Sequence, residues 1–441
     1  MTGETRPPSA PAGGTFRSLR IRNYRIWAVG AFVSNIGTWM QRTAQDWIVL
    51  AQLTPHNATA VGIVMSLQFG PIALLLPFTG YAADRFDRRK LLVVTQATMG
   101  LLALALGLLT VTGLVRLWHV YLFALLLGCA TAFDAPARQT FVAELVGEGE
   151  LSNAVALNST SFNAARLVGP AAAGLMIDGL GTGWVFLVNA ASFAAVLASL
   201  RGLRVSELHR GAHARRAPGG LAEGLRYVRR RPDLVAILTM LFLIGTFGLN
   251  FPIFLSTMSV TVFHAGARAY GLLTSAMAVG SVTGALVSAR RARPKPGLLL
   301  SASAVFGIGL ALAAVMPNYW LFGMLLVGVG TSVQLFNTTA NSTVQLSTEP
   351  AMRGRVMALL LAIALGGTPV GAPLVGWVAD RFGARWGLGV GVASGLLSVA
   401  VGLRYLVRHR GLRLVDEGGR LRMRLDPAPP ARAVTESASG P

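Results

Sequence analysis

The sequence predicts an all-α integral membrane protein with twelve transmembrane helices in two pseudo-symmetric six-helix halves. Three observations lead to this fold class: the composition, the placement of the basic residues, and an internal repeat. Of the 441 residues, 53% are hydrophobic and 13% are charged, whereas a soluble domain has about 25% charged residues. A transmembrane helix needs about 20 mostly apolar residues, so this length accommodates twelve helices joined by short loops.

The apolar segments divide the chain in order. The predicted helices cover residues 24–53, 60–83, 91–112, 118–141, 151–177, 183–200, 233–262, 270–289, 297–316, 319–346, 355–379 and 386–407. They group into an N-terminal half (24–203) and a C-terminal half (233–407), with a basic linker (204–232) between them. Residues 1–23 form an N-terminal tail, and the charged, proline-containing tail at 408–441 is predicted to be disordered.

The basic residues predict the topology. The net charge is +21, but 33 of the 39 Lys and Arg residues fall in tails, loops and helix ends on one predicted side of the membrane. This asymmetry is typical of the positive-inside rule and excludes a nucleic-acid-binding surface. We therefore expect a multi-pass protein of the cell inner membrane, with both termini and the linker in the cytoplasm. The single cysteine, Cys129, excludes a disulfide framework and a cysteine metal site, and we expect no metal and no cofactor.

An internal repeat predicts the pseudo-symmetry. Two predicted helices carry the same pattern 202 residues apart: Gly169, Gly174 and Asp178, and Gly371, Gly376 and Asp380. A third copy of Gly-x-x-x-Asp, Gly80 and Asp84, ends the helix at 60–83. In the predicted topology the helix at 60–83 ends in the cytoplasm, whereas the helix at 151–177 ends on the outside. These two copies therefore have opposite orientations, an arrangement typical of secondary transporters.

Charged residues inside the predicted helices mark a candidate cavity, because a charge at bilayer depth is costly and usually faces a cavity or a partner. Arg42 and Asp46 share one helix face with Asn35. They either line the cavity or form a structural ion pair that orients the helix. Arg166, preceded by Asn158, needs a carboxylate or carbonyl partner, for which Asp46 is a candidate. Neutral polar residues either line the same cavity or join helices: Gln68, Asn250, Gln334, Asn337 and Asn341.

Residues 80–90 have the sequence GYAADRFDRRK, with a glycine, two aspartates and four basic residues. This segment resembles the signature loop of the major facilitator superfamily, and it departs from that pattern at Asp87, where glycine is usual. The segments at 23–50, 133–146 and 163–174 resemble the branch of enterobactin-exporter and macrolide-efflux-like proteins, the transmembrane secretion effectors. The resemblance implies a cytoplasmic gate in which Asp84 and Arg88 lock the two halves. The alternative is that Arg85, Arg88, Arg89 and Lys90 only fix the topology.

Two further segments bear on the mechanism. Gly169, Pro170 and Gly174 resemble the helix-5 motif of superfamily antiporters; the alternative is close helix packing without directional meaning. Asp134 and Arg138, four residues apart, are interpreted as gate residues, with an exposed pair at a helix end as the alternative. The arginine usual in the fourth helix of the superfamily is replaced by Ala124, which leaves Asp46 as the titratable candidate for proton coupling.

The sequence therefore predicts a monomeric secondary transporter, not an enzyme. It would export small, mostly apolar molecules, drug-like or siderophore-like, by proton antiport and alternating access. Its partners would be a small-molecule substrate, protons and the lipid bilayer, with no nucleic acid. The competing hypotheses are an importer or facilitator, a transport-dead sensor, and a membrane enzyme. The last lacks a nucleophile–base pair or metal ligands at one depth.

Overall fold

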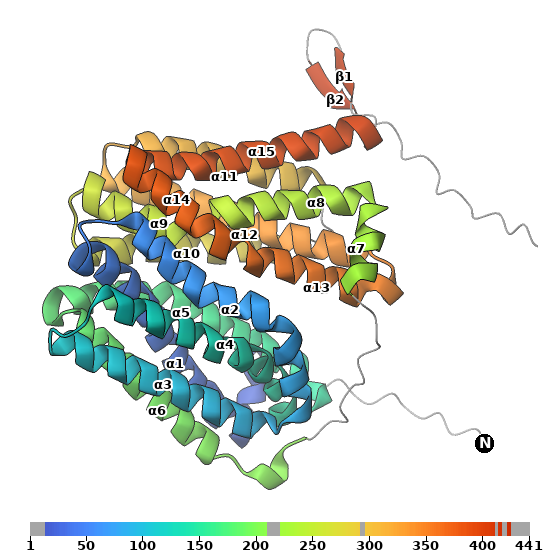
Figure 1. Cartoon of the computed structure of the whole chain (residues 1–441). Helices are drawn as coiled ribbons and strands as arrows, with labels where there is room; N and C mark the ends of the chain where they lie inside the picture. The colour runs from blue at the N-terminus through green and yellow to red at the C-terminus, as the bar shows by residue number, and fades with distance from the viewer. Residues whose placement is uncertain (1–13, 210–220, 292–295, 411–412, 417–420, 425–441) are drawn as a thin grey trace, which may run out of the picture.

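The computed structural model describes residues 14–209, 221–291, 296–410, 413–416 and 421–424. Nearly all of this chain is helical, and the helices form one elongated bundle (Figure 1). The first group of helices is α1 (Arg22–Trp47), α2 (Ala58–Arg85), α3 (Arg88–Val111), α4 (Leu117–Val146), α5 (Leu151–Leu180) and α6 (Thr182–Arg201). The second group is α8 (Pro232–Leu243), α9 (Phe251–Thr257), α10 (Ala267–Ala289), α11 (Pro296–Val315), α12 (Tyr319–Ser347), α13 (Pro350–Gly366), α14 (Thr368–Phe382) and α15 (Ala384–Arg410).

Short elements complete the chain. The 3-10 turns are η1 (Arg17–Arg20), η3 (Glu148–Glu150) and η4 (Val205–Glu207), and the π-helical segments are η2 (Ile48–Leu53), η5 (Ile244–Gly248) and η6 (Met258–Val262). The helix α7 (Leu221–Arg229) lies in the basic linker, where the sequence predicted only a connection. The strands β1 (Arg413–Asp416) and β2 (Leu421–Arg424) pair antiparallel, with Leu414 opposite Met423. Of the tail at 408–441, which the sequence predicted to be disordered, residues 408–410 belong to α15 and these eight residues form the two strands, while residues 411–412, 417–420 and 425–441 lie outside the described chain.

Ten helices of the described chain are long and apolar enough to cross a membrane. This makes the chain a multi-pass membrane protein. The first and fifth predicted spans, α1 and α5, are helices of 26 and 30 residues but are not among the ten. Polar and charged side chains interrupt their apolar sequence, as Arg42 and Asp46 do in α1. The number twelve therefore stays a prediction.

Two predicted helices are broken. The segment predicted at 233–262 is interrupted between η5 and α9 at Leu249 and Asn250, because Pro252 lacks a backbone donor and the side chain of Asn250 donates to the carbonyl of Thr246 at 2.8 Å. The segment predicted at 355–379 divides into α13 and α14 at Gly367, two residues before Pro369. Breaks of this kind occur at membrane depth where the backbone is buried in protein or lines a cavity.

The two groups of helices lie side by side along their lengths (Figure 1). Within the first group α3 packs on α6 and α2 on α4, and within the second α12 packs on α10 and α11. The principal contacts between the groups are α2 with α14 and α5 with α10. We call the end where α1 begins and α15 finishes the basic end, because the arginine-rich connections at residues 85–90, 201–209 and 221–231 lie there. The other end, where α1 meets α2, is the opposite end.

Candidate functional site

A cavity of about 330 Å³ lies between the two groups of helices. Side chains from both groups line it, so its shape depends on how the groups are placed against each other. Its lining residues are Trp39, Arg42, Thr43, Asp46, Met65, Gln68, Phe69, Arg166, Leu249, Phe251, Pro252, Leu255, Tyr270, Thr274, Met277, Ser281, Val333, Gln334, Asn337 and Thr368. A second hollow shares Gln334 and Asn337 and is also lined by Thr338, Asn341 and Ser342. Because α12 runs toward the basic end, the second hollow extends the cavity in that direction.

Two arginines in the cavity contact one tryptophan. The guanidinium carbon of Arg42 lies 5.0 Å from the ring centre of Trp39, and that of Arg166 lies 5.6 Å from it. Arg42 also lies 5.7 Å from the ring centre of Phe69. Cations at such distances are attracted by the negative face of the ring. The aromatic rings therefore give partial compensation to two cations from different helices, α1 and α5.

Asp46 is the one carboxylate among the residues that line the cavity in the described chain. The hydroxyl of Tyr270 donates a hydrogen bond to its Oδ2 at 3.0 Å. Tyr270 also stacks on Trp47, with ring centres 6.1 Å apart. This contact joins α1 to α10, and so joins the first group of helices to the second.

The charged residues do not pair as the sequence suggested. Within the described chain no ion pair within 4.0 Å links Asp46 to Arg42 or to Arg166, so the predicted ion pairs of Asp46 are wrong for this structure. The reason is the neighbouring helix. Tyr270 of α10 donates a hydrogen bond to the carboxylate of Asp46, while both guanidiniums make cation–π contacts with Trp39. Arg42 Nε is buried without a hydrogen-bond partner.

The neutral polar residues divide into two sets. Gln68, Gln334 and Asn337 line the cavity, and Asn341 lines its extension. Three predicted cavity residues are not in its lining. Asn35 accepts a hydrogen bond from Arg138 at 3.2 Å, and Asn250 is buried at the break before α9. Asn158 lies on the half of α5 nearer the basic end, about two turns before Arg166.

At the opposite end, α14 closes against α2. A Cβ on Gly62 would lie 2.5 Å from the carbonyl oxygen of Ala372, and one on Gly376 would lie 2.5 Å from that of Ala58. Asp380 caps the start of α2: its carboxylate accepts from the backbone nitrogens of Ala58 at 2.6 Å and Thr59 at 2.8 Å, and from the Thr59 hydroxyl. Ser66 donates to the carbonyl of Pro369 at 2.6 Å, deeper in the bundle.

The helices α5 and α10 make the matching contact. Gly174 packs on the backbone of Ala267, and Gly271 packs on the carbonyl of Pro170. Ser275 donates to the carbonyl of Leu167 at 2.7 Å. Gly169 faces α1 instead, where a Cβ would lie 2.6 Å from the Cβ of Trp39. The predicted helix-5 motif is therefore the place where α5 approaches both α1 and α10, and the cavity is closed toward the opposite end.

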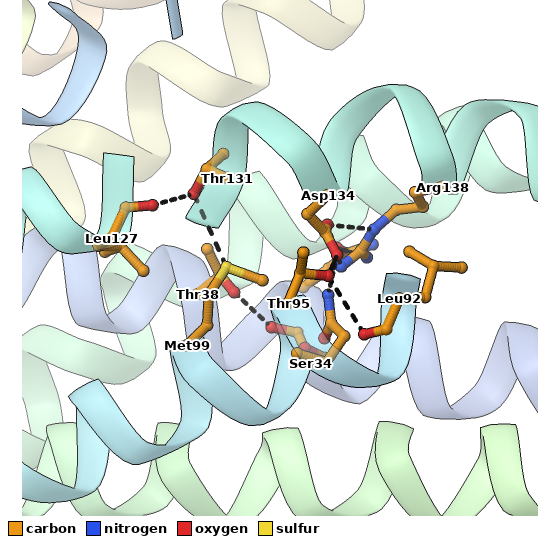
Figure 2. A network of polar contacts seen from close by, with 11 residues as sticks. Ser34, Thr38, Leu92, Thr95, Met99, Leu127, Thr131, Asp134 and Arg138 are labelled. Carbon is orange, nitrogen blue, oxygen red and sulfur yellow. Dashed lines mark hydrogen bonds and ion pairs between the residues drawn. The ribbon is translucent and has the colours of Figure 1, made fainter. Parts of the chain in front are cut away.

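Near the basic end, a buried polar network joins three helices of the first group (Figure 2). Asp134 of α4 is 4% exposed. It accepts from Thr95 at 2.9 Å and Gln96 at 2.6 Å, both on α3, and pairs with Arg138 at 3.0 Å. Arg138 then donates to Asn35 of α1. The alternative of an exposed pair at a helix end is wrong, because the carboxylate is buried among three partners.

The loop at residues 85–90 also contacts the first group. Arg88 pairs with Glu144 of α4 at 2.6 Å, and Arg89 donates to the carbonyl of Leu200 of α6 at 2.9 Å. Arg85 ends α2. Gly80 and Asp84 lie within α2, but the Asp84 side chain is outside the described part of the structure. The predicted lock between Asp84 and Arg88 therefore stays a prediction.

Sequence reasoning missed the aromatic residues of the cavity. Trp39 and Tyr270 contact the charged groups directly, and Phe69 adds a second ring. The spacing of Trp39 and Arg42, three residues apart on one helix face, was an available signal. No local pattern marks Tyr270, because its partner lies 224 residues away. In the part of the chain that is described, no three His, Cys, Asp or Glu side chains come together as a metal site.

The comparisons with known proteins agree with this architecture. The family model described as transmembrane secretion effector matches residues 13–427. The chain belongs to this family of major facilitator transporters. Its members are membrane transporters and not enzymes, as predicted.

Individual relatives and structures are similar over most of the chain. It is 27% identical to the staphyloferrin A transporter of Staphylococcus aureus, over 80% of this chain and 88% of the relative. It is 26% identical to the enterobactin exporter EntS of Shigella flexneri, over 74% of this chain and 78% of the relative. A crystal structure of the nucleoside transporter NupG superimposes with a TM-score of 0.70 at 13% identity, covering 87% of this chain and 100% of that structure. This last similarity establishes the fold.

Proposed function

We propose that the chain is a secondary active exporter that works by alternating access. The observation that carries this proposal is the cavity between the two groups of helices, closed toward the opposite end and extended toward the basic end. By the positive-inside rule the basic end is cytoplasmic, so this conformation would load substrate from the cytoplasm. Rocking of the two groups would then expose the same cavity to the outside.

Twelve passes in two pseudo-symmetric halves, residues 24–203 and 233–407, complete the proposal. The helices α1 and α5 would be the two passes that composition alone does not identify. Their polar residues include Arg42, Asp46 and Arg166, which line the cavity, and a polar face on a cavity is the usual reason for low hydropathy in a spanning helix. The protein would act as a monomer in the inner membrane with both termini in the cytoplasm. Labelling of cysteines introduced at Phe16 and Arg408 in intact and lysed cells tests this topology, and labelling of either in intact cells contradicts it.

Export is favoured over import by the relatives, of which one is an enterobactin exporter. The substrate would be a small, mostly apolar molecule, drug-like or siderophore-like, since apolar side chains such as Met65, Phe251 and Leu255 form much of the cavity. The helix-5 motif is a weaker argument, because its glycines make close helix contacts that an importer would also need. An importer or facilitator of a small metabolite remains the competing function.

Proton antiport is the proposed source of energy, with Asp46 as the coupling residue. A group that couples proton movement to substrate movement should be titratable, face the cavity and contact both halves. Asp46 lines the cavity and accepts from Tyr270 of the second group. Gain or loss of its proton would alter this contact between α1 and α10, and with it the balance between the two conformations.

The test is a flux assay in proteoliposomes with an imposed pH gradient and a panel of candidate compounds. We expect gradient-driven movement by the wild-type chain and by Glu148→Gln, which changes an exposed carboxylate at the basic end. Asp46→Asn should remove the dependence on the gradient. Full gradient-driven transport by Asp46→Asn would contradict the coupling assignment. Binding of a compound without any flux would instead favour a transport-dead sensor.

A further inference from the structure

The charge balance of the cavity is uneven. Two guanidiniums, Arg42 and Arg166, line it, but Asp46 is its one carboxylate in the described chain. That carboxylate accepts a hydrogen bond from Tyr270 and pairs with neither arginine. With all three groups ionised, the cavity therefore carries an excess of positive charge at the place where the two groups of helices meet.

The compensation that the protein supplies to these cations is incomplete. Arg42 contacts the rings of Trp39 and Phe69, and Arg166 contacts the ring of Trp39. An aromatic face attracts a cation but accepts no directed hydrogen bond in the plane of the guanidinium. Arg42 Nε is buried and has no acceptor. Buried charges are ordinarily paired, because an unpaired one is costly. The cavity therefore resembles a binding site in which the ligand supplies the missing negative charge.

The geometry also limits what the ligand can be. Both guanidinium carbons lie within 5.6 Å of the ring centre of Trp39, and both side chains line the same cavity, so an anionic group bound beside this ring would be attracted by both cations. Guanidinium donors match the planar, two-oxygen shape of a carboxylate. The rest of the lining is largely apolar and aromatic, including Phe69, Phe251 and Leu255. A volume of about 330 Å³ is at the small end of the range for drug-sized ligands.

We propose that Arg42 and Arg166, arranged around Trp39, recognise the acidic group of an amphiphilic organic acid whose apolar part lies against the aromatic lining of the cavity. This inference rests on the proposed function and adds the substrate class to it. It narrows the proposed substrate class from small, mostly apolar molecules to molecules that carry one carboxylate on an apolar body. It also gives the cavity a basis for rejecting amphiphilic cations, which the same arginines repel.

The experiment measures binding, not transport, with ligands that differ only in charge. The full-length chain in nanodiscs of zwitterionic lipid is titrated with three matched pairs of acid and amide: 2-naphthoate and 2-naphthamide, biphenyl-4-carboxylate and its amide, and indole-3-acetate and its amide. 2-Naphthylmethylamine serves as the cationic analogue. We expect at least one acid to bind about tenfold or more tightly than its amide, the preference that one charge-assisted pair supplies, and the amine to bind more weakly than 2-naphthamide. If no acid binds more tightly than its amide, the proposal is wrong.

Variants locate the preference. Arg42→Gln and Arg166→Gln should each reduce the acid-to-amide ratio several-fold while the amide still binds, which also shows that the cavity is intact. Arg42→Lys should keep part of the ratio, because the charge remains and the planar fork is lost. Arg116→Gln removes an exposed arginine at the start of α4 and should leave the ratio unchanged. An unchanged ratio in both cavity variants overturns the proposal.

A membrane lipid could supply the same acidic group. Adding phosphatidylglycerol to the nanodiscs separates the two sources. We expect the acid to keep its affinity, as it would in a site for a free organic acid, and competition by the lipid overturns the assignment to a free acid. Failure of transport is distinguishable from failure of this inference. Acid preference without gradient-driven flux would contradict the exporter, and flux of uncharged compounds without acid preference would contradict the present inference.

Discussion

Asp380 caps a helix of the other group, and its removal should open the opposite end. The first three backbone nitrogens of α2 are those of Ala58, Thr59 and Ala60. Asn57 accepts from Ala60 at 2.8 Å within the same helix, whereas Asp380 accepts from Ala58 and Thr59 across the interface between α14 and α2. The first cap moves with α2, but the second exists only while the opposite end is closed. Asp380→Ala therefore acts on the closed conformation alone.

The magnitude follows from these contacts. Loss of a side-chain cap costs about 1 kcal/mol in typical cases, within a range of about 0.5–2 kcal/mol. Asp380 is exposed, as are its two hydrogen bonds with Thr59, whereas the one from Ala58 is part-buried, so water replaces part of what is lost and the typical value applies better than the upper limit. About 1 kcal/mol corresponds to a roughly fivefold change in the ratio of the two conformations.

The assay is a distance measurement between two spin labels at the opposite end. Leu114→Cys and Val315→Cys, both at exposed positions, carry the labels in a Cys129→Ala background. We expect Asp380→Ala to raise the ratio of the long-distance to the short-distance population about fivefold. Glu148→Ala removes an exposed carboxylate at the basic end and should have no effect. An unchanged ratio in Asp380→Ala, in a protein with an unaltered melting temperature, would refute the reasoning.

Three further predictions concern other contacts described above: the buried network of Asp134, the contact between α5 and α10 at Gly271, and the hydrogen bond of Tyr270. Asp134→Ala should lower the free energy of unfolding by about 3 kcal/mol, because it leaves Arg138 without its ion-pair partner among buried groups; a thermal melt of the purified protein measures this. Gly271→Ala should favour opening of the opposite end by about 1–3 kcal/mol, because the new methyl group meets the carbonyl of Pro170, and the same spin labels report it. Tyr270→Phe should lower the free energy of unfolding by about 1–2 kcal/mol, because Asp46 loses its donor inside the bundle, again measured by thermal melting.

Each of the three has a matched control. Thr98→Ala, an exposed position on α3, controls for Asp134→Ala, and an equal effect of the two would contradict the role of the network. Gly179→Ala adds a methyl group where nothing lies within 4 Å, so it should not change the label distances. Tyr121→Phe changes a hydroxyl that has no hydrogen-bond partner among the described residues. If Tyr121→Phe lowered the melting temperature as much as Tyr270→Phe, the result would contradict the claim that the hydrogen bond between Tyr270 and Asp46 stabilises the protein.

The positions of the helices were predictable because they depend on local composition. Each predicted segment coincides with one helix or with a run of consecutive helical elements, with ends that differ by a few residues. The breaks before α9 and α14 were missed even though Pro252 and Pro369 were visible in the sequence. A proline kinks or breaks a helix according to what the neighbouring helices supply to the freed backbone groups. The short helix α7 was missed because its surroundings read as a charged linker.

The residues of the site were predictable as a set but not as contacts. Arg42, Asp46 and Arg166 were identified because charge in an apolar segment is costly and needs an explanation. Their partners were not. Asp46 contacts Tyr270 rather than Arg42, and Arg166 contacts Trp39 rather than Asp46. Asn35 faces Arg138 of the network in Figure 2 rather than the cavity.

Composition and charge order along the chain determined that this protein is a helical bundle of the membrane, where its helices run, and which of its residues are out of place in lipid. The tertiary structure decided which of those residues meet. The caps and contacts between the groups join residues 224 and 322 positions apart, and they depend on the rotation and depth of each helix against its neighbours. Hydropathy is summed over a segment, so it does not specify the rotation or the depth of a helix. A hydrogen bond or a cation–π contact, in contrast, forms only within a narrow range of distances and angles.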